Sequence, residues 1–382
     1  MRRSLTTVIA TAVLAAAVTP AAAAQSSDPG LEAVALSSQQ TEAVDAALFA
    51  TLDAAETLDL TQPRFPSQLT SSDPSAPAPA AQPITEAAIV DKQVEDAAAR
   101  LERWTVASPS MGRDVEIQII RAVDPAAPAP HVYLLGGAES PRVSHWVSEG
   151  WAPEVFAHEQ ATVIMPTQAY ASFYSDWRAD DPVLGRSRWE TFLADELAPL
   201  LAAEPELNFN GGRALGGLSM GAIGAVHLAN SRPDVYDAVI GISGCYSTMD
   251  TPGQLNTHVQ VGLRGGDVAN MWGPVGSEDW WRHDVVANPE GLRTMAVYLY
   301  AGNGVLGQRD RNYYAGTALH EAVAGSLQER GSMHCTLALD ESMRAHGMTH
   351  QKVVIDSTGA HNWNVFGSQL RPAWEHVRPA LY

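Results

Sequence analysis

The chain has 382 residues, with 24 Lys and Arg against 43 Asp and Glu, so its formal net charge is −19. A surface this acidic repels phosphate backbones and argues against a nucleic acid partner, while it suits a well-solvated exported protein. The length after residue 98 is sufficient for one large hydrophobic core, and no internal repeat divides it.

Residues 1–24 have the organisation of an export signal. Arg2 and Arg3 give a basic start, residues 5–18 are apolar, and four alanines at 21–24 provide a small-residue cleavage site. The apolar stretch is shorter than the ~20 residues that span a bilayer, and nothing later in the sequence predicts a transmembrane segment. We therefore expect a cleaved signal peptide and a secreted or cell-envelope protein.

Residues 25–98 differ in composition from the rest of the chain. Prolines cluster between residues 74 and 83, which is typical of a linker, and apolar residues at 44, 48, 52 and 55 have helical spacing. We assign this segment to an Ala/Pro-rich helical and linker extension without a catalytic role, and residues 99–382 to a single catalytic domain.

Apolar, β-prone runs alternate with helical patterns through this domain. The expected strands are residues 115–120, 131–135, 161–165, 213–218, 238–243, 295–301 and 352–355. Alternation of this kind predicts an α/β fold with a mostly parallel central sheet flanked by helices, in which chemistry is sought just after the carboxyl ends of the strands.

The fourth of these strands runs into Gly-Leu-Ser-Met-Gly at residues 217–221, and a small-residue helical pattern comes next. Strand, sharp turn and helix are the context of the nucleophile elbow of α/β-hydrolases, in which glycines on both sides of the serine avoid steric collision. Ser219 is therefore the predicted nucleophile of an acyl-transfer reaction.

A serine nucleophile needs a histidine base, which a carboxylate holds in the correct tautomer. In this fold the order along the chain is serine, acid, histidine, and His361 follows the last expected strand, where the base belongs. Asp310 lies in the commonest place for the acid, and Glu321 and Glu329 lie on the next helical segment. Position alone does not rank these three carboxylates.

Acyl transfer also needs two backbone N–H groups that stabilise the oxyanion. Met220, directly after the nucleophile, is expected to provide one of them. The strand at 131–135 runs into Gly136 and Gly137, so the amide of Ala138 is the second candidate.

Several separate segments, in one order, resemble the exported mycolyltransferases of mycobacteria and corynebacteria, which are esterase D-like α/β-hydrolases. The resemblance runs from about residue 104 to the end of the chain. It rests on SMGRD at 110–114, VYLL at 132–135, SFYSDW at 172–177, WETFL at 189–193, GLSMG at 217–221, MWGP at 271–274, GNG at 302–304 and GAHNW at 359–363.

The resemblance implies that a mycoloyl group passes from trehalose monomycolate to Ser219, and then to trehalose monomycolate, arabinogalactan or another cell-envelope hydroxyl, with no metal or other cofactor. The corynebacterial pattern has a Glu six residues before a Cys-Thr pair, which here favours Glu329 as the acid. It also implies a disulfide between Cys245 and Cys335, and a sugar-stacking role for Trp363.

One departure from the family concerns the loop after the strand at 131–135. Mycobacterial members carry an Asp and an Arg there that bind trehalose, whereas this chain has Gly136 and Glu139, so Arg142 becomes the candidate for a rebuilt sugar contact. Two alternatives to mycoloyl transfer stay open: a secreted carboxylesterase, and a cell-surface binding protein without catalysis. The sequence does not indicate an oligomeric state.

Overall fold

The structure is a computed structural model that describes residues 81–317 and 319–382. The predicted signal peptide, the helix expected near residues 44–55 and the first part of the Pro-rich segment lie outside the described residues.

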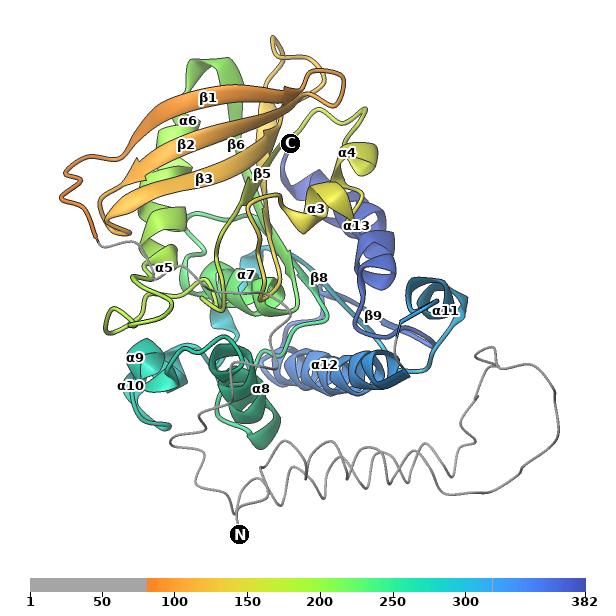
Figure 1. The fold of residues 1–382 in the computed structure, drawn as a ribbon. Coiled ribbons are helices and arrows are strands. Elements are labelled where there is room, and N and C mark those ends of the chain that lie inside the picture. The colour runs from red at the N-terminus through yellow and green to blue at the C-terminus, as the bar shows by residue number, and fades with distance from the viewer. Residues whose placement is uncertain (1–80, 318) are drawn as a thin grey trace, which may run out of the picture.

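A single nine-stranded sheet, in the order β1-β2-β3-β5-β4-β6-β7-β8-β9, forms the centre of the fold (Figure 1). The strands β5, β4, β6, β7, β8 and β9 pair in parallel, whereas β1, β2 and β3 add an antiparallel extension through the β3–β5 pair. The strands are Ala88–Asp96, Leu101–Ser108, Arg113–Ile120, Ala129–Leu135, Thr162–Pro166, Phe209–Leu218, Ala238–Ile242, Ala296–Gly302 and Lys352–Asp356 for β1 to β9.

All seven strands expected from the sequence are present as β3 to β9, and the mostly parallel sheet confirms the predicted fold class. The sequence analysis missed β1 and β2. The sheet begins at Ala88, before the expected domain boundary at residue 99, so part of the segment assigned to the linker is an edge strand. β1 is largely exposed and charged, and it therefore lacks the apolar alternation by which a strand is recognised.

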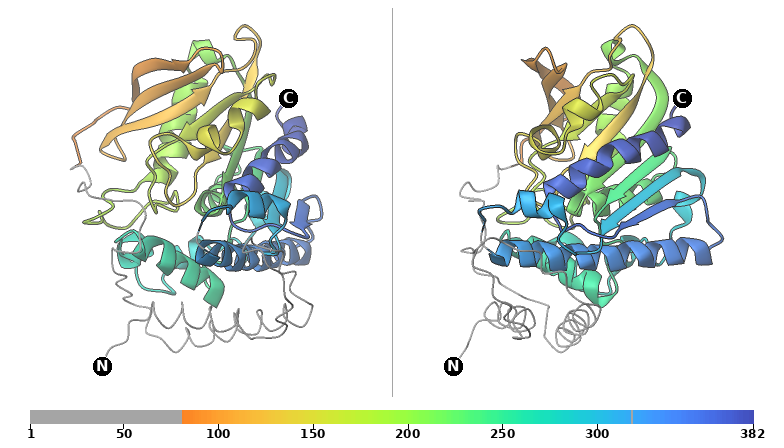
Figure 2. Two further views of the ribbon diagram at one scale, coloured as in Figure 1. Left: turned by 45° about the vertical axis from the view of Figure 1, so that its right-hand side comes forward. Right: turned by 90° about the vertical axis from the view of Figure 1, so that its right-hand side faces the viewer.

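Helices cover both faces of the sheet, as the two views of Figure 2 make clear. Along β4 the side chains alternate: Val132 and Leu134 join a core with α3, α4 and α13, whereas Tyr133 and Leu135 join a core with α7 and α12. This alternation results from the two-residue period of a strand buried on both faces, and it gives a three-layer α/β/α architecture.

The helices that bear on the site are α5 (Trp189–Thr191), α7 (Met220–Ser231), α10 (Glu278–Arg282), α11 (Gln308–Tyr313), α12 (Leu319–Ala345) and α13 (Trp363–Val377). The others are α3 (His145–Ser148), α4 (Ala152–Val155), α6 (Ala198–Ala202), α8 (Thr251–Gly262) and α9 (Val268–Trp272), with a π-helix at Phe192–Leu197 and 3₁₀ turns at Pro205–Leu207, Glu290–Thr294 and Arg378–Ala380. Among residues 81–317 and 319–382, no helix is both long and apolar enough to cross a membrane.

A disulfide joins Cys245, just after β7, to Cys335 on α12, with 4.7 Å between the two Cα atoms. The pairing implied by the family resemblance is therefore present. It fastens the middle of α12 to the carboxyl-end side of the sheet, and it closes a loop with a sequence separation of 90 residues.

Replacing both cysteines by serine should lower the free energy of unfolding by about 4 kcal/mol, because the reduced chain regains the entropy of an open loop of this length. Urea unfolding followed by circular dichroism measures this change, with the wild-type protein under reducing conditions as a matched control. An unchanged midpoint in both samples would contradict a native disulfide.

Candidate active site

Ser219 occupies the turn between β6 and α7 with backbone angles φ 51° and ψ −124°. A positive φ is strained for any residue with a side chain, and such strain is typical of functional turns. The turn is possible because glycines flank it: a Cβ on Gly217 would collide with the backbone of Gly221, and one on Gly221 would collide with the Gly136 carbonyl. The tight packing thus explains both glycines of the motif.

The structure brings Ser219, His361 and Glu329 into one hydrogen-bonded chain. Ser219 Oγ lies 2.9 Å from His361 Nε2, and His361 Nδ1 lies 2.8 Å from Glu329 Oε2. A carboxylate only accepts, so Nδ1 carries the proton and Nε2 is left to accept one from the serine hydroxyl. The serine and the carboxylate are buried, with Ser219 8% and Glu329 0% exposed.

The second oxygen of Glu329 has two further donors. The Ser243 hydroxyl, just after β7, donates to Oε1 over 2.6 Å, and the N–H of Gly302 at the end of β8 donates over 2.7 Å. A buried carboxylate is tolerated when it is hydrogen-bonded in this way. Sequence analysis missed Ser243; its place one residue beyond a buried parallel strand was the available signal.

The other two candidates for the acid lie elsewhere. Asp310 is fully buried on α11, where it accepts hydrogen bonds from the backbone N–H groups of Gly307 and Ala360 and from Asn362 Nδ2, at 2.7 to 2.8 Å. It therefore anchors the loop that carries His361 without a bond to the imidazole ring. Glu321 is exposed on α12.

The residues expected to provide the oxyanion donors are Met220, directly after the nucleophile, and Ala138, in the loop after β4. Met220 is the first residue of α7, so no carbonyl of that helix can accept its N–H. On the other side, a Cβ added to Gly137 would stand 3.9 Å from the Cβ of Ser219, so the loop after β4 approaches the serine at the residue before Ala138. The Gly136 N–H is already used, because it donates to the Tyr174 hydroxyl over 2.8 Å.

The loop around Ala138 is tied down from both sides. The Ala138 carbonyl accepts the N–H of Ala171, and burial is the main cause that raises the pKa of Tyr174 to about 12, so its hydroxyl keeps its proton. This rigidity is the preorganisation that an oxyanion site requires.

The two expected substrate-binding residues differ in their surroundings. Trp363 begins α13, two residues after His361, and its partly buried ring makes edge contacts with His145, Trp146 and Phe366. Arg142 is 57% exposed and forms an ion pair with Glu116 on β3, at 2.7 Å. The guanidinium of Arg142 is thus already paired with a strand of the antiparallel extension.

A different arginine lies near the altered loop. Arg264 Nη2 is 3.8 Å from Glu139 Oε1, and burial lowers the pKa of this guanidinium despite the nearby carboxylate. Sequence analysis missed Arg264, because it lies far along the chain in the segment after α8 and no motif surrounds it.

The fold and the hydrogen-bonded serine, histidine and carboxylate define a serine hydrolase of the α/β-hydrolase class. A family model described as a putative esterase matches residues 108–377, and the chain belongs to this family. Within it, the chain belongs with the mycolyltransferases: it is 30% identical over 279 residues to the diacylglycerol acyltransferase/mycolyltransferase Ag85A of Mycobacterium leprae, which covers 71% of this chain and 80% of that protein.

Two further relatives agree with this assignment. The diacylglycerol acyltransferase/mycolyltransferase Ag85B of Mycolicibacterium smegmatis is 30% identical over 287 residues, covering 71% of this chain and 82% of the relative. Among solved structures, Mycobacterium tuberculosis MPT51 (FbpC1) superposes with a TM-score of 0.59 at 25% identity, covering 73% of this chain and 97% of its own. The family expected from the sequence motifs is thereby confirmed.

The roles of the two buried carboxylates can be separated by mutation. Glu329→Gln should lower kcat by about 10³ to 10⁴, because the neutral amide no longer stabilises the imidazolium. Asp310→Asn should instead lower the free energy of unfolding by about 2 kcal/mol, through weakened hydrogen bonds, and reduce kcat by less than about tenfold.

Hydrolysis of a short nitrophenyl ester and thermal unfolding measure the two effects on the same samples. A loss of activity by orders of magnitude in Asp310→Asn alone, with Glu329→Gln close to wild type, would reverse the two assignments.

Proposed function

We propose that this chain is an exported acyltransferase that moves a mycoloyl group from trehalose monomycolate, through an acyl-Ser219 intermediate, to trehalose monomycolate, arabinogalactan or another cell-envelope hydroxyl. The observation that carries the proposal is the hydrogen-bonded chain Ser219–His361–Glu329 in a member of the mycolyltransferase family. The basic and apolar start of the sequence and the disulfide support export.

The first half-reaction follows from the protonation states of the three residues. As Ser219 Oγ attacks the ester carbonyl, its proton passes to His361 Nε2, and Glu329 stabilises the resulting imidazolium. The negative charge moves to the former carbonyl oxygen, which the N–H groups of Met220 and Ala138 stabilise. Collapse of this intermediate breaks the ester bond, and His361 returns the proton to the departing trehalose oxygen.

The second half-reaction runs the same steps in reverse with a new hydroxyl. His361 removes the proton from the acceptor as its oxygen attacks the acyl-serine, and the released Ser219 Oγ takes that proton back. In the two half-reactions together, every bond that breaks is matched by one that forms, with no metal or external reductant as a reactant. The trehalose leaves before the acceptor reacts, so the kinetics are of the ping-pong type. Trp363 lies two residues after His361, and its ring provides an aromatic face for a sugar ring.

A carboxylesterase is the second candidate, because the matching family model is described as a putative esterase. It would use the same acyl-enzyme and pass the acyl group to water. The two functions differ in how the acyl-serine partitions between hydroxyl acceptors and water, which depends on how well the site excludes water. A binding protein without catalysis is disfavoured by the aligned serine and histidine.

Purified protein incubated with labelled trehalose monomycolate should yield trehalose dimycolate, or mycoloylated acceptor, together with free trehalose. Ser219→Ala should reduce the rate by about 10⁴ or more, because the covalent intermediate cannot form. In the same assay Trp363→Leu should raise KM for the trehalose donor. In a separate assay, its rate of hydrolysis of a short nitrophenyl ester should stay within about threefold of the wild-type rate.

Chromatographic separation of the lipid products gives the ratio of transfer to hydrolysis at fixed donor concentration. Free mycolic acid as the sole product would favour the esterase. Full activity in Ser219→Ala would refute both catalytic functions.

A further inference from the structure

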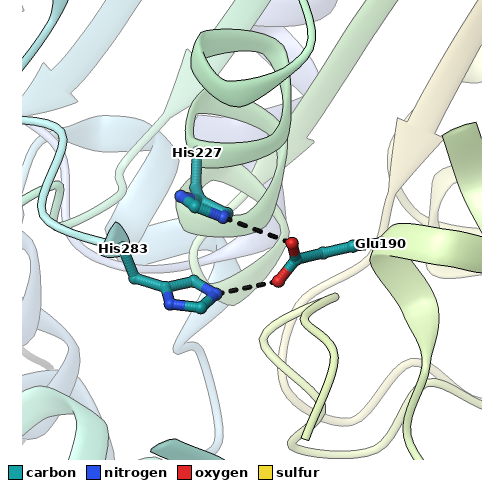
Figure 3. Close-up of side chains that lie close together, drawn as sticks. All are labelled: Glu190, His227 and His283. Carbon is teal, nitrogen blue, oxygen red and sulfur yellow. Dashed lines mark hydrogen bonds and ion pairs between the residues drawn. The ribbon is translucent and has the colours of Figure 1, made fainter. Parts of the chain in front are cut away.

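Three side chains that the acyl-transfer chemistry does not use converge in the interior (Figure 3). Glu190 lies on α5, His227 on α7, and His283 directly follows α10. One carboxylate oxygen and one ring nitrogen from each histidine lie within 4.8 Å of one another. Both histidines are buried, with 2% and 3% exposure, and the Glu190 side chain is 12% exposed.

His227 lacks a hydrogen-bond partner at both ring nitrogens among the described residues. Its Nε2 points at Glu190 but lies 3.7 Å from Oε2, which is too long for a hydrogen bond. A buried polar group left in this way costs about 1–3 kcal/mol and calls for an explanation, such as an ion. The gap between nitrogen and oxygen is of the size that a bridging cation fills.

His283 presents a second mismatch. Its Nδ1 lies 2.6 Å from the Asp279 carbonyl, which only accepts, so Nδ1 carries a proton. Its Nε2 lies 2.8 Å from Glu190 Oε1, and a carboxylate has no proton to offer, so a neutral ring directs its lone pair at that oxygen. In that form of the ring two electron-rich atoms face each other, and a cation between them would attract both.

Arg282 provides part of the positive charge at this position. Its Nη1 lies 2.7 Å from Glu190 Oε2, and its Nη2 lies 3.2 Å from Oε1 and 3.3 Å from His283 Nε2. It provides no partner for His227. Its side chain is 40% exposed, and Asp279 Oδ1 at 3.5 Å from its Nε offers a second partner, so the guanidinium can leave Glu190 without losing an acidic neighbour.

We propose that Glu190, His227 and His283 form a binding site for a divalent transition metal of the zinc type, with water as a fourth ligand. Two imidazole nitrogens and one carboxylate oxygen are a ligand set that suits Zn²⁺, whereas Mg²⁺ and Ca²⁺ prefer oxygen alone. The Asp279 carbonyl on Nδ1 of His283 is the outer hydrogen bond that usually orients a ligating histidine.

The site has a structural role. His227 lies about 12 Å along α7 from the nucleophile, and the ion ties that helix to α5 and to the end of α10. These elements come from separate parts of the chain, so the metal fixes the position of the helix whose first N–H serves the oxyanion.

The test measures metal binding in the Ser219→Ala protein, so that its outcome is independent of the proposed acyl transfer. Chelator-treated protein is dialysed against Zn²⁺, or against Co²⁺, which reports its ligands through visible absorption bands. We expect one equivalent of Zn²⁺ per chain by plasma mass spectrometry and a higher melting temperature with the metal. Failure of the folded protein to retain stoichiometric Zn²⁺ would overturn the proposal.

Variants identify the ligands. His227→Gln and His283→Gln should each weaken Zn²⁺ binding by about 100-fold or more and remove the Co²⁺ bands, whereas the exposed His346→Gln is a matched control that keeps both. Unchanged binding in both ligand variants, with folding checked by circular dichroism, would refute the site.

Arg282→Gln separates a metal site from a simple buried ion pair. Removal of the competing guanidinium should increase Zn²⁺ affinity by about tenfold or more, since one unit of positive charge leaves the carboxylate. If the role of Glu190 is only to bind Arg282 and His283 in a buried ion pair, the same variant loses stability and gains no metal affinity. That result would contradict the proposal. This variant decides the question even if the histidine variants fail to fold.

Discussion

The active site depends on one buried carboxylate. Glu329 is fully shielded from solvent, and its charge is tolerated because three donors surround it: the His361 ring, the Ser243 hydroxyl and the Gly302 N–H. These donors come from the loop after β9, from the end of β7 and from the end of β8. A single side chain therefore links α12, the ends of β7 and β8 and the histidine loop through three hydrogen bonds.

The disulfide and Asp310 support that arrangement from two sides. Cys335 joins the helix of Glu329 to the strand end at Cys245. Asp310 accepts hydrogen bonds from the Ala360 N–H and from the Asn362 side-chain amide, on either side of His361. With the histidine fixed in this way, the strained turn at Ser219 is sufficient to bring its hydroxyl within hydrogen-bond distance of His361. The hydrogen-bonded residues therefore lie on rigid elements, and the loop around Ala138 beside them has an ion pair between Glu139 and Arg264.

Much of the fold and of the candidate active site could be predicted from the sequence. The features that could not be predicted were hidden for physical reasons. Ser219 and His361 come after recognisable strands in a fixed order, so local patterns sufficed. The acid could not be chosen by position, since Asp310 and Glu329 are both buried near the histidine. Glu329 binds the imidazole ring, whereas Asp310 binds the neighbouring residues Ala360 and Asn362. The family resemblance, rather than spacing, selected Glu329.

Long-range pairings were the main omission. β1 was hidden by its exposed and charged surface, and Arg264 and the group Glu190, His227 and His283 are assembled from segments that no motif connects. Arg142 was nominated because it is near the altered loop in sequence, whereas its side chain pairs with Glu116 on a neighbouring strand. Proximity along the chain is thus a poor guide to a binding contact.

The central claim is that the acyl group passes through Ser219. Rapid quenching of the protein in acid shortly after mixing with trehalose monomycolate, followed by mass spectrometry of its peptides, tests this most directly. The account predicts a mycoloyl adduct on the peptide that contains Ser219, and none in His361→Gln at the same time point. An adduct on another residue, or product formation in the quenched samples with no adduct at any time, would contradict it.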